Sequence, residues 1–211
     1  MGLLFVRKSA KVILGIWEVT ESPEELLQEV NLTSGEEAFF EQLRSPLRKK
    51  HWLAYRLILP HLTDEKFVSG ISYDSHGKPS LDNQAGHISV AHSGRFATMI
   101  YSRHQQVGID IEAIQPKIIK LAHKFLSPVE LEYKFPAHLT ESLCLIWCAK
   151  EALYKLYGGR GVVFSEHLHI DPFLYEGTGQ ITGSVTVNGK RRAYRLYYET
   201  IDDYLLVYLC D

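Results

Sequence analysis

The stretch VGIDIEAIQ, residues 107–115, places two acidic side chains inside an otherwise apolar run. The alternation of Ile109 and Ile111 with the acids is typical of a β-strand. Because strand side chains point alternately to opposite faces, Asp110 and Glu112 are predicted to share one face and the isoleucines the other. Two carboxylates at that spacing repel each other unless water, a proton or a cation lies between them. The strand therefore predicts a polar site on its acidic face.

A second stretch, TESLCLIWCAKEALYKLYGG at residues 140–159, has the spacing of a long amphipathic helix that its final glycine pair would end. Glu151 and Lys155 are four residues apart and share one helix face, whereas Lys150 is rotated by about 100° to the side. Taken alone, this pattern favours an exposed Glu–Lys pair, which contributes about 0.2–0.5 kcal/mol. The first stretch changes the interpretation, because it supplies further acids.

Together the two stretches offer three carboxylates, Asp110, Glu112 and Glu151, flanked by Lys150 and Lys155. Mg²⁺ takes oxygen ligands and often shares phosphate oxygens with its substrate. Lysines neutralise the remaining phosphate charge as point charges. This combination of residues predicts phosphoryl or phosphodiester chemistry, in which positioning and charge neutralisation supply most of the catalysis.

The composition is that of an ordinary globular protein. The 211 residues are 45% hydrophobic and carry a formal net charge of −2, which gives no global case for nucleic-acid or membrane binding. No run approaches the ~18 apolar residues of a membrane span. The odd count of 3 cysteines, at no repeating spacing, argues against a disulfide scaffold and predicts a reducing compartment, so we expect a cytoplasmic protein.

The order of the predicted elements divides the chain into two α+β halves. We expect two similar α/β halves packed together, each a small, mostly antiparallel sheet with helices on one side, over residues 1–105 and 106–211. Capping boxes at Ser22–Glu25 and Ser127–Glu130 predict helix starts, and Asn188-Gly189 predicts a hairpin turn. Strands are predicted at residues 3–7, 11–19, 87–93, 95–102, 106–112, 179–187, 190–200 and 203–210, and the main helices at 23–30, 46–62 and 140–157.

At the two acidic stretches the sequence resembles a known family. VGIDIE and WCAKEALYK are similar to the paired signature of the 4′-phosphopantetheinyl transferases, a G-x-D-x-E strand and a W-x-x-K-E-x-x-x-K helix. The GKP, HISVAHSGRFATMIYS and FLSPVE stretches agree with further family segments, and the similarity runs from about residue 44 to 165. The length resembles that of the longer, monomeric subgroup.

The resemblance implies that the chain moves the phosphopantetheine arm of coenzyme A onto a serine of an apo acyl or peptidyl carrier protein. Asp110, Glu112 and Glu151 would hold Mg²⁺, with Mn²⁺ as an alternative. Glu151 would also take the proton from the serine hydroxyl, directly or through a water. Lys155 would stabilise charge on the attacked phosphate, and Lys150 would contact the pyrophosphate.

The resemblance also assigns residues to coenzyme A binding in the N-terminal half, and metal and catalytic residues to the C-terminal half. Lys78 and His92 would reach the adenosine end and its 3′-phosphate, and Arg48 and Lys49 would contact phosphate. Ala91 departs from the family pattern, which usually has serine there. The missing hydroxyl predicts weaker coenzyme A binding, since a neutral hydrogen bond contributes about 0.5–1.5 kcal/mol.

Two other functions stay open from the sequence. A metal-dependent nuclease with a D…E-x-K site would need a lysine two residues after Glu112, where Ile114 stands. A non-catalytic homologue that only binds coenzyme A or a carrier protein is the stronger alternative, and Ala91 keeps it open.

Overall fold

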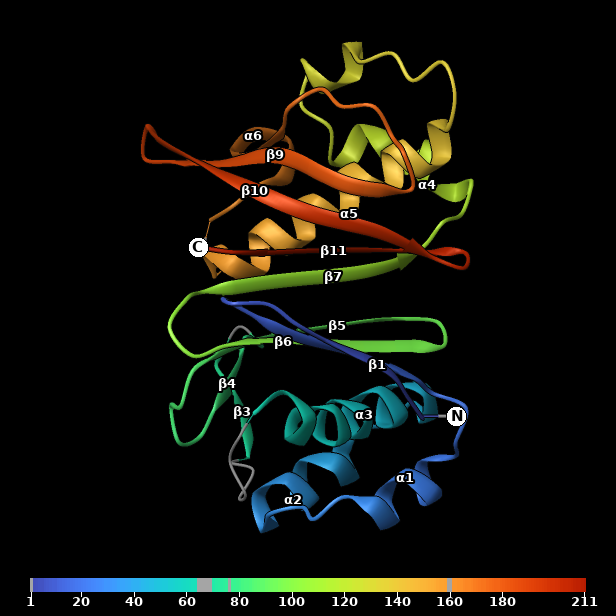
Figure 1. Cartoon of the computed structure of the whole chain (residues 1–211), viewed down its shortest axis with the longest axis vertical. Coiled ribbons are helices and arrows are strands. Elements are labelled where there is room, and N and C mark those ends of the chain that lie inside the picture. The colour runs from blue at the N-terminus through green and yellow to red at the C-terminus, as the bar shows by residue number, and fades with distance from the viewer. Residues whose placement is uncertain (1, 64–69, 76, 159–160) are drawn as a thin grey trace. The chain divides into compact units, whose positions relative to one another are not determined.

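The computed structural model describes residues 2–63, 70–75, 77–158 and 161–211. The chain folds into two compact units, Met1–Gln106 and Val107–Asp211, and each has an antiparallel sheet with helices (Figure 1). The predicted α+β class with antiparallel sheets is confirmed.

The first unit is built on a four-stranded antiparallel sheet in the order β1-β2-β6-β5. Its strands are β1 (Gly2–Lys8), β2 (Ile13–Glu18), β5 (His87–Ser93) and β6 (Phe96–Ser102), and a separate pair is formed by β3 (Ile71–Tyr73) and β4 (Pro79–Leu81). The helices are α1 (Pro23–Glu29), α2 (Ser34–Gln42) and α3 (Pro46–Leu62). Helix α3 packs on β2 and β6, and α1 packs on α3 (Figure 1).

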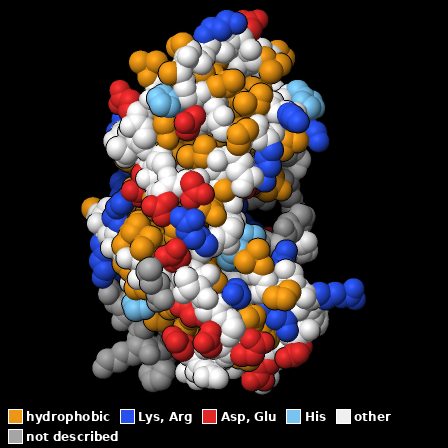
Figure 2. Space-filling view, turned by 90° about the vertical axis from the view of Figure 1, so that its right-hand side faces the viewer, with side chains coloured by type: hydrophobic (Ala, Val, Ile, Leu, Met, Phe, Trp, Pro, Cys, Tyr) orange, Lys and Arg blue, Asp and Glu red, His pale blue; other side chains and the backbone are white. Residues whose placement is uncertain are grey.

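Helix starts in this unit follow the capping residues of the sequence. The Ser22 hydroxyl accepts a hydrogen bond from the backbone of Glu25, and the Glu25 carboxylate accepts one from the backbone of Ser22, which is the predicted capping box. Thr33 and Glu36 form a second one at the start of α2. The outer faces of α1 and α2 are acidic, and acidic side chains gather at the lower end of Figure 2.

The second unit has a five-stranded antiparallel sheet in the order β7-β11-β10-β9-β8. Its strands are β7 (Val107–Ala113), β8 (Leu168–Ile170), β9 (Thr178–Val187), β10 (Lys190–Ile201) and β11 (Tyr204–Cys210). Its helices are α4 (Lys117–Leu121), α5 (Leu139–Tyr157) and α6 (Phe164–His167), with 3₁₀ turns η1 (Ala122–Lys124) and η2 (Glu130–Glu132). Helix α5 packs on β7, β8, β9 and β11, so it lies across the sheet.

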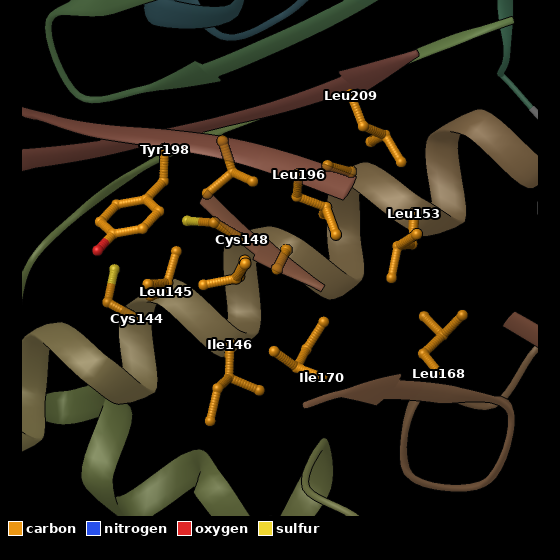
Figure 3. Close-up of a cluster of buried hydrophobic side chains, with 14 of the residues drawn as sticks. Cys144, Leu145, Ile146, Cys148, Leu153, Leu168, Ile170, Leu196, Tyr198 and Leu209 are labelled. Carbon is orange, nitrogen blue, oxygen red and sulfur yellow. The ribbon is translucent and has the colours of Figure 1, made fainter. Parts of the chain in front are cut away.

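The core of the second unit forms between α5 and the sheet. Figure 3 shows this cluster, which includes Ile146 and Leu153 of α5 and Leu196 of β10 among other buried side chains. Cys144 and Cys148 belong to the same cluster and are free thiols, as their apolar surroundings predict. This packing fixes which face of α5 is apolar and which face is left for the acids.

The predicted turns of the second unit are present, with one difference. Asn188 and Gly189 have φ of 52° and 71°, the left-handed pair of a type I′ hairpin turn. Gly158 ends α5 with φ of 95°, and Gly159 lies outside the described residues. The capping bonds between Ser127 and Glu130 also form, but the chain continues only as the 3₁₀ turn η2.

Candidate active site

The acidic face of β7 is the face that meets α5. A Cβ added to Gly108 would lie 2.0 Å from the carbonyl oxygen of Ala152, so helix and strand backbones are nearly in contact there. Two residues along, Asp110 bonds to Lys155 of α5, and Glu112 bonds to Trp147 of the same helix. The prediction that both acids share one strand face is confirmed, and the glycine explains how the helix comes so close.

Asp110 is a buried acid with half of its hydrogen bonding unmet. Its Oδ1 accepts a 2.7 Å hydrogen bond from Nζ of Lys155, which also donates to the carbonyl oxygen of Ile109 at 3.1 Å. Its Oδ2 is buried and accepts no hydrogen bond from any residue that the structure describes. Burial raises the pKa of the Asp110 carboxyl, and Lys155 opposes the rise. Such an oxygen is suited to a donor or cation supplied from outside.

Glu151 lies on α5 within electrostatic reach of the same acids. Burial, with the charges of Asp110 and Glu112 adding to it, raises the pKa of Glu151 to about 7, and Lys155 opposes the rise. A carboxyl group poised near neutral pH is suited to accept and return a proton. Glu112 is held in place, because its Oε1 accepts a hydrogen bond of 3.4 Å from Nε1 of Trp147.

The three acids are residue types that bind metal ions, but their side chains are not yet grouped as the ligands of one ion. Among the described residues, no three acid, histidine or cysteine side chains already stand close enough together to hold an ion. The residue types nevertheless fit a hard divalent cation, since the unmet Oδ2 of Asp110 and the mutual repulsion of the acids would both be relieved by one. The predicted Mg²⁺ site stays a prediction, and it requires side chains to move.

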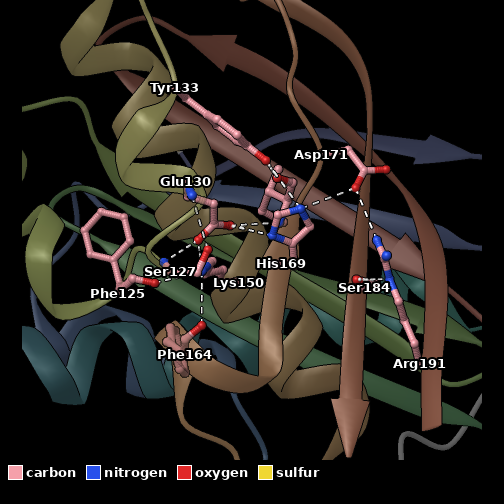
Figure 4. A network of polar contacts seen from close by, with 11 residues as sticks. Phe125, Ser127, Glu130, Tyr133, Lys150, Phe164, His169, Asp171, Ser184 and Arg191 are labelled. Atoms are coloured by element: carbon pink, nitrogen blue, oxygen red, sulfur yellow. Dashed lines mark hydrogen bonds and ion pairs between the residues drawn. The ribbon is translucent and has the colours of Figure 1, made fainter. Parts of the chain in front are cut away.

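The side chain of Lys150 does not lie where the sequence predicts. Its side chain is fully buried, and its ammonium donates to the carbonyl oxygens of Phe125 at 2.7 Å and Phe164 at 3.1 Å and to Oε2 of Glu130 at 2.6 Å (Figure 4). These bonds use every proton of the ammonium group. The predicted contact between Lys150 and a pyrophosphate is therefore wrong in this structure, because the side chain points into the core of the unit.

In the first unit, His92 lies at the end of β5 against α3. Its ring stacks on that of His51, with centroids 4.4 Å apart and planes 15° apart, and Nε2 of His51 bonds to the carbonyl oxygen of Gly94. Burial and the neighbouring His92 lower the pKa of His51 to about 4. His92 is exposed, whereas Ala91 is buried and its side chain points to the opposite strand face.

The other basic candidates lie in different places. Arg48 is exposed in the first turn of α3, and the Lys49 ammonium sits 4.5 Å from the centroid of the Phe40 ring. Lys78 lines a small pocket of about 190 Å³ with residues that include His87, and His92 is not among them. Burial lowers the pKa of Lys78. The binding roles of Lys78 and His92 stay predictions.

Two residues with a clear structural part in the site were not singled out from the sequence. Glu130 was predicted as a capping residue within the FLSPVE stretch, and His51 was given no role. The capping pattern identified the local bonds of Glu130, but its ion pair joins residues 20 apart in the chain. Contacts between residues so far apart in the chain leave no periodic pattern or fixed spacing in a single sequence, so the sequence does not predict them.

The chain is similar in sequence to known proteins of one family. Residues 106–209 match the family model of the 4′-phosphopantetheinyl transferase superfamily. The protein slr0495 of Synechocystis sp., whose name assigns it provisionally to these transferases, is 31% identical over 140 residues, covering 60% of this chain and 57% of that protein. The 4′-phosphopantetheinyl transferase Sfp of Bacillus subtilis is 32% identical over 109 residues, covering 47% and 48%.

A third relative is matched over more of its length. The 4′-phosphopantetheinyl transferase HetI of Nostoc sp. is 27% identical over 172 residues, covering 74% of this chain and 72% of HetI. For slr0495 and Sfp the matched region spans only about half of the relative. The family match contains both β7 and α5, which carry the acids and Lys155. Over its C-terminal half, the chain is thus similar to the 4′-phosphopantetheinyl transferase superfamily.

Proposed function

We propose that the chain transfers the 4′-phosphopantetheine arm of coenzyme A to a serine hydroxyl of an acyl or peptidyl carrier protein. The observation that carries the proposal is the contact between β7 and α5, where Asp110 bonds to Lys155. Burial there, with the charge of Asp110 adding to it, raises the pKa of Glu151. An acid poised near neutral pH beside an ammonium group is what the attack of an alcohol on a phosphate requires.

Glu151 is the proposed base. A serine hydroxyl is a poor nucleophile, so a base must lie within hydrogen-bond reach of its proton, about 2.6–3.2 Å. The serine oxygen forms a bond to the β-phosphorus of coenzyme A, and its proton passes to Glu151, directly or through a water. The bond from that phosphorus to the bridging oxygen breaks, and its electron pair leaves with adenosine 3′,5′-bisphosphate.

Lys155 is the proposed stabiliser of charge on the attacked phosphate. It now donates to Asp110 and to the carbonyl oxygen of Ile109, and its side chain is 27% exposed, so an incoming phosphate can approach it. Asp110, Glu112 and Glu151 are the side chains that would hold Mg²⁺ or Mn²⁺. When bound, the ion would supply positive charge against the pyrophosphate.

The binding roles are also proposals. Arg48, Lys49, Lys78 and His92 of the first unit would bind coenzyme A, and the second unit would carry the metal and the chemistry. We further propose that the chain acts as a monomer in the cytoplasm, on an apo carrier protein. In the described part of the chain, no helix is long and apolar enough to cross a membrane.

The proposal is tested by following adenosine 3′,5′-bisphosphate chromatographically after the protein is mixed with coenzyme A, Mg²⁺ and a panel of apo carrier proteins. Release is expected only when a carrier is present, and a carrier whose acceptor serine is changed to alanine should give none. Coenzyme A binding without release from any carrier would favour the alternative, a non-catalytic binding homologue.

A further inference from the structure

Lys150 and Glu130 form a buried ion pair in the second unit. Both side chains are 0% exposed, and Nζ of Lys150 lies 2.6 Å from Oε2 of Glu130. Figure 4 shows the two groups at the centre of a network that reaches several segments of the unit. A buried pair of charges is costly to desolvate and is a weak source of stability, so its presence calls for another role.

The carboxylate of Glu130 is fully committed to holding the chain around it. Oε2 also accepts a hydrogen bond from the backbone of Ser127 at 2.7 Å, and Oε1 accepts one from the backbone of Ile170 at 2.9 Å. His169 lies nearby, with its Nδ1 at 3.8 Å from Oε1. Glu130 thus joins the η2 segment to β8.

The ammonium of Lys150 extends this connection to α5 and α6. It donates to the carbonyl oxygens of Phe125, before η2, and of Phe164, at the start of α6. Lys150 stands in the middle of α5, so three irregular or short segments are held to the centre of that helix by one side chain. The rotation of α5 about its own axis is therefore tied to the second unit's outer segments.

The neighbouring position in α5 is Glu151. Successive helix positions are about 100° apart, so fixing Lys150 on one side also fixes the direction of Glu151. Glu151 lies one turn before Lys155, on the helix face where Lys155 bonds to Asp110 of β7. We propose, resting on the function proposed above, that Lys150 and Glu130 are positioning residues: their buried ion pair sets the rotation of α5 and thereby the place of Glu151 beside Asp110. Lys150 does not touch substrate.

Lys150→Arg separates this role from a phosphate contact. An exposed lysine that meets phosphate tolerates arginine, which binds phosphate at least as well. The buried ammonium sits among acceptors at 2.6–3.1 Å, and the larger guanidinium does not fit there. We expect Lys150→Arg to lower the melting temperature and to lower kcat at least tenfold, measured well below that temperature, with the KM for coenzyme A changed less than twofold.

The matched control is Lys190→Met, which removes an exposed lysine of the same unit and should leave the melting temperature, kcat and KM unchanged. Wild-type kcat, KM and melting temperature for Lys150→Arg would overturn the proposal. A lower melting temperature with unchanged kcat would also overturn it, since the pair would then stabilise the fold without positioning Glu151.

A thermal double-mutant cycle keeps the inference testable without any activity. Lys150→Met and Glu130→Leu each leave one buried charge unpaired, whereas the double variant leaves none. We expect the double variant to lose clearly less in melting temperature than the sum of the two single losses. Additive losses would contradict the ion pair. If the wild type transfers nothing, the proposed function fails, and the cycle still decides whether the pair exists.

Discussion

Asp110 of β7 and Lys155 of α5 are joined by a 2.7 Å hydrogen bond between Oδ1 and Nζ, while Oδ2 of Asp110 accepts no bond from the described residues. The strand that bears the acid and the helix that bears the lysine thus contact each other where the chemistry is proposed.

Glu151→Gln should abolish the proposed transfer while leaving the fold intact. The amide keeps the size of the side chain but cannot take a proton, and general-base catalysis contributes about 10²–10⁴-fold. We expect kcat to fall by at least 100-fold, with the melting temperature not reduced. The exposed Glu132→Gln is the matched control and should behave as wild type. Normal labelling of a carrier by Glu151→Gln would refute its role as base.

The raised pKa of Glu151 predicts a pH dependence of stability in the metal-free protein. Its pKa of about 7 lies above the ordinary 4.5, so between these values the folded chain holds a proton that the unfolded chain has lost. The free energy of unfolding contributed by this group therefore falls as pH rises through that window, by at most about 3 kcal/mol.

Urea unfolding in EDTA at pH 4 to 8 checks this dependence by comparing wild type with Glu151→Gln. The variant lacks the titration, so its stability relative to wild type should increase as pH rises. A difference that stays constant across the range would show that Glu151 titrates normally. Because Mg²⁺ favours the ionised carboxyl, its stabilising effect on wild type should grow with pH.

The pKa of His51, which burial and the neighbouring His92 lower, predicts an opposite pH effect in the first unit. The pKa of His51 is lowered from 6.5 to about 4. Between these pH values His51 is therefore protonated in the unfolded chain but neutral in the folded chain. Stability from this group is present above pH 6.5 and is lost as pH falls toward 4, by roughly 3 kcal/mol.

His51→Gln should remove this acid-dependent loss, as measured by urea unfolding between pH 4 and 7. The exposed His104→Gln is the control and should retain the wild-type loss. Identical pH profiles for wild type and His51→Gln would mean that His51 is protonated in the folded protein.

Gly108→Ala should separate α5 from β7. The added methyl group would lie 2.0 Å from the carbonyl oxygen of Ala152, and both elements would have to shift. Overpacking of this kind costs about 1–3 kcal/mol or more, and the displaced helix would carry Glu151 away from Asp110. Gly35→Ala meets nothing within 4 Å and is the control. The melting temperature measured by calorimetry and kcat should both fall for Gly108→Ala. An unaffected kcat would contradict the need for close packing of α5 on β7.

The features that sequence reasoning predicted are those with a local physical cause. The alternation of Ile109 and Ile111 with Asp110 and Glu112 follows from the two-residue period of a strand, and the structure has it. The long helix follows from its apolar spacing, and the Asn188-Gly189 hairpin follows from the φ angles that these residues tolerate.

The features that it missed depend on distant partners. The motif places a lysine at position 150 but does not tell whether its ammonium points to solvent or into the core. Its contacts with Phe125, Glu130 and Phe164 show that it points into the core. The short strand β8 has 3 residues and too little sequence for a period to show. Three-residue elements form because the neighbouring strand β9 offers them a partner.

The central claim is the transfer of phosphopantetheine to a carrier protein, and the intact mass of the carrier tests it most directly. After incubation of the wild-type chain with coenzyme A, Mg²⁺ and an apo carrier, the account predicts that the carrier gains the mass of one phosphopantetheine group, and that it gains none with Glu151→Gln. An unchanged carrier mass across a panel of folded apo carriers, with coenzyme A measurably bound, would contradict it.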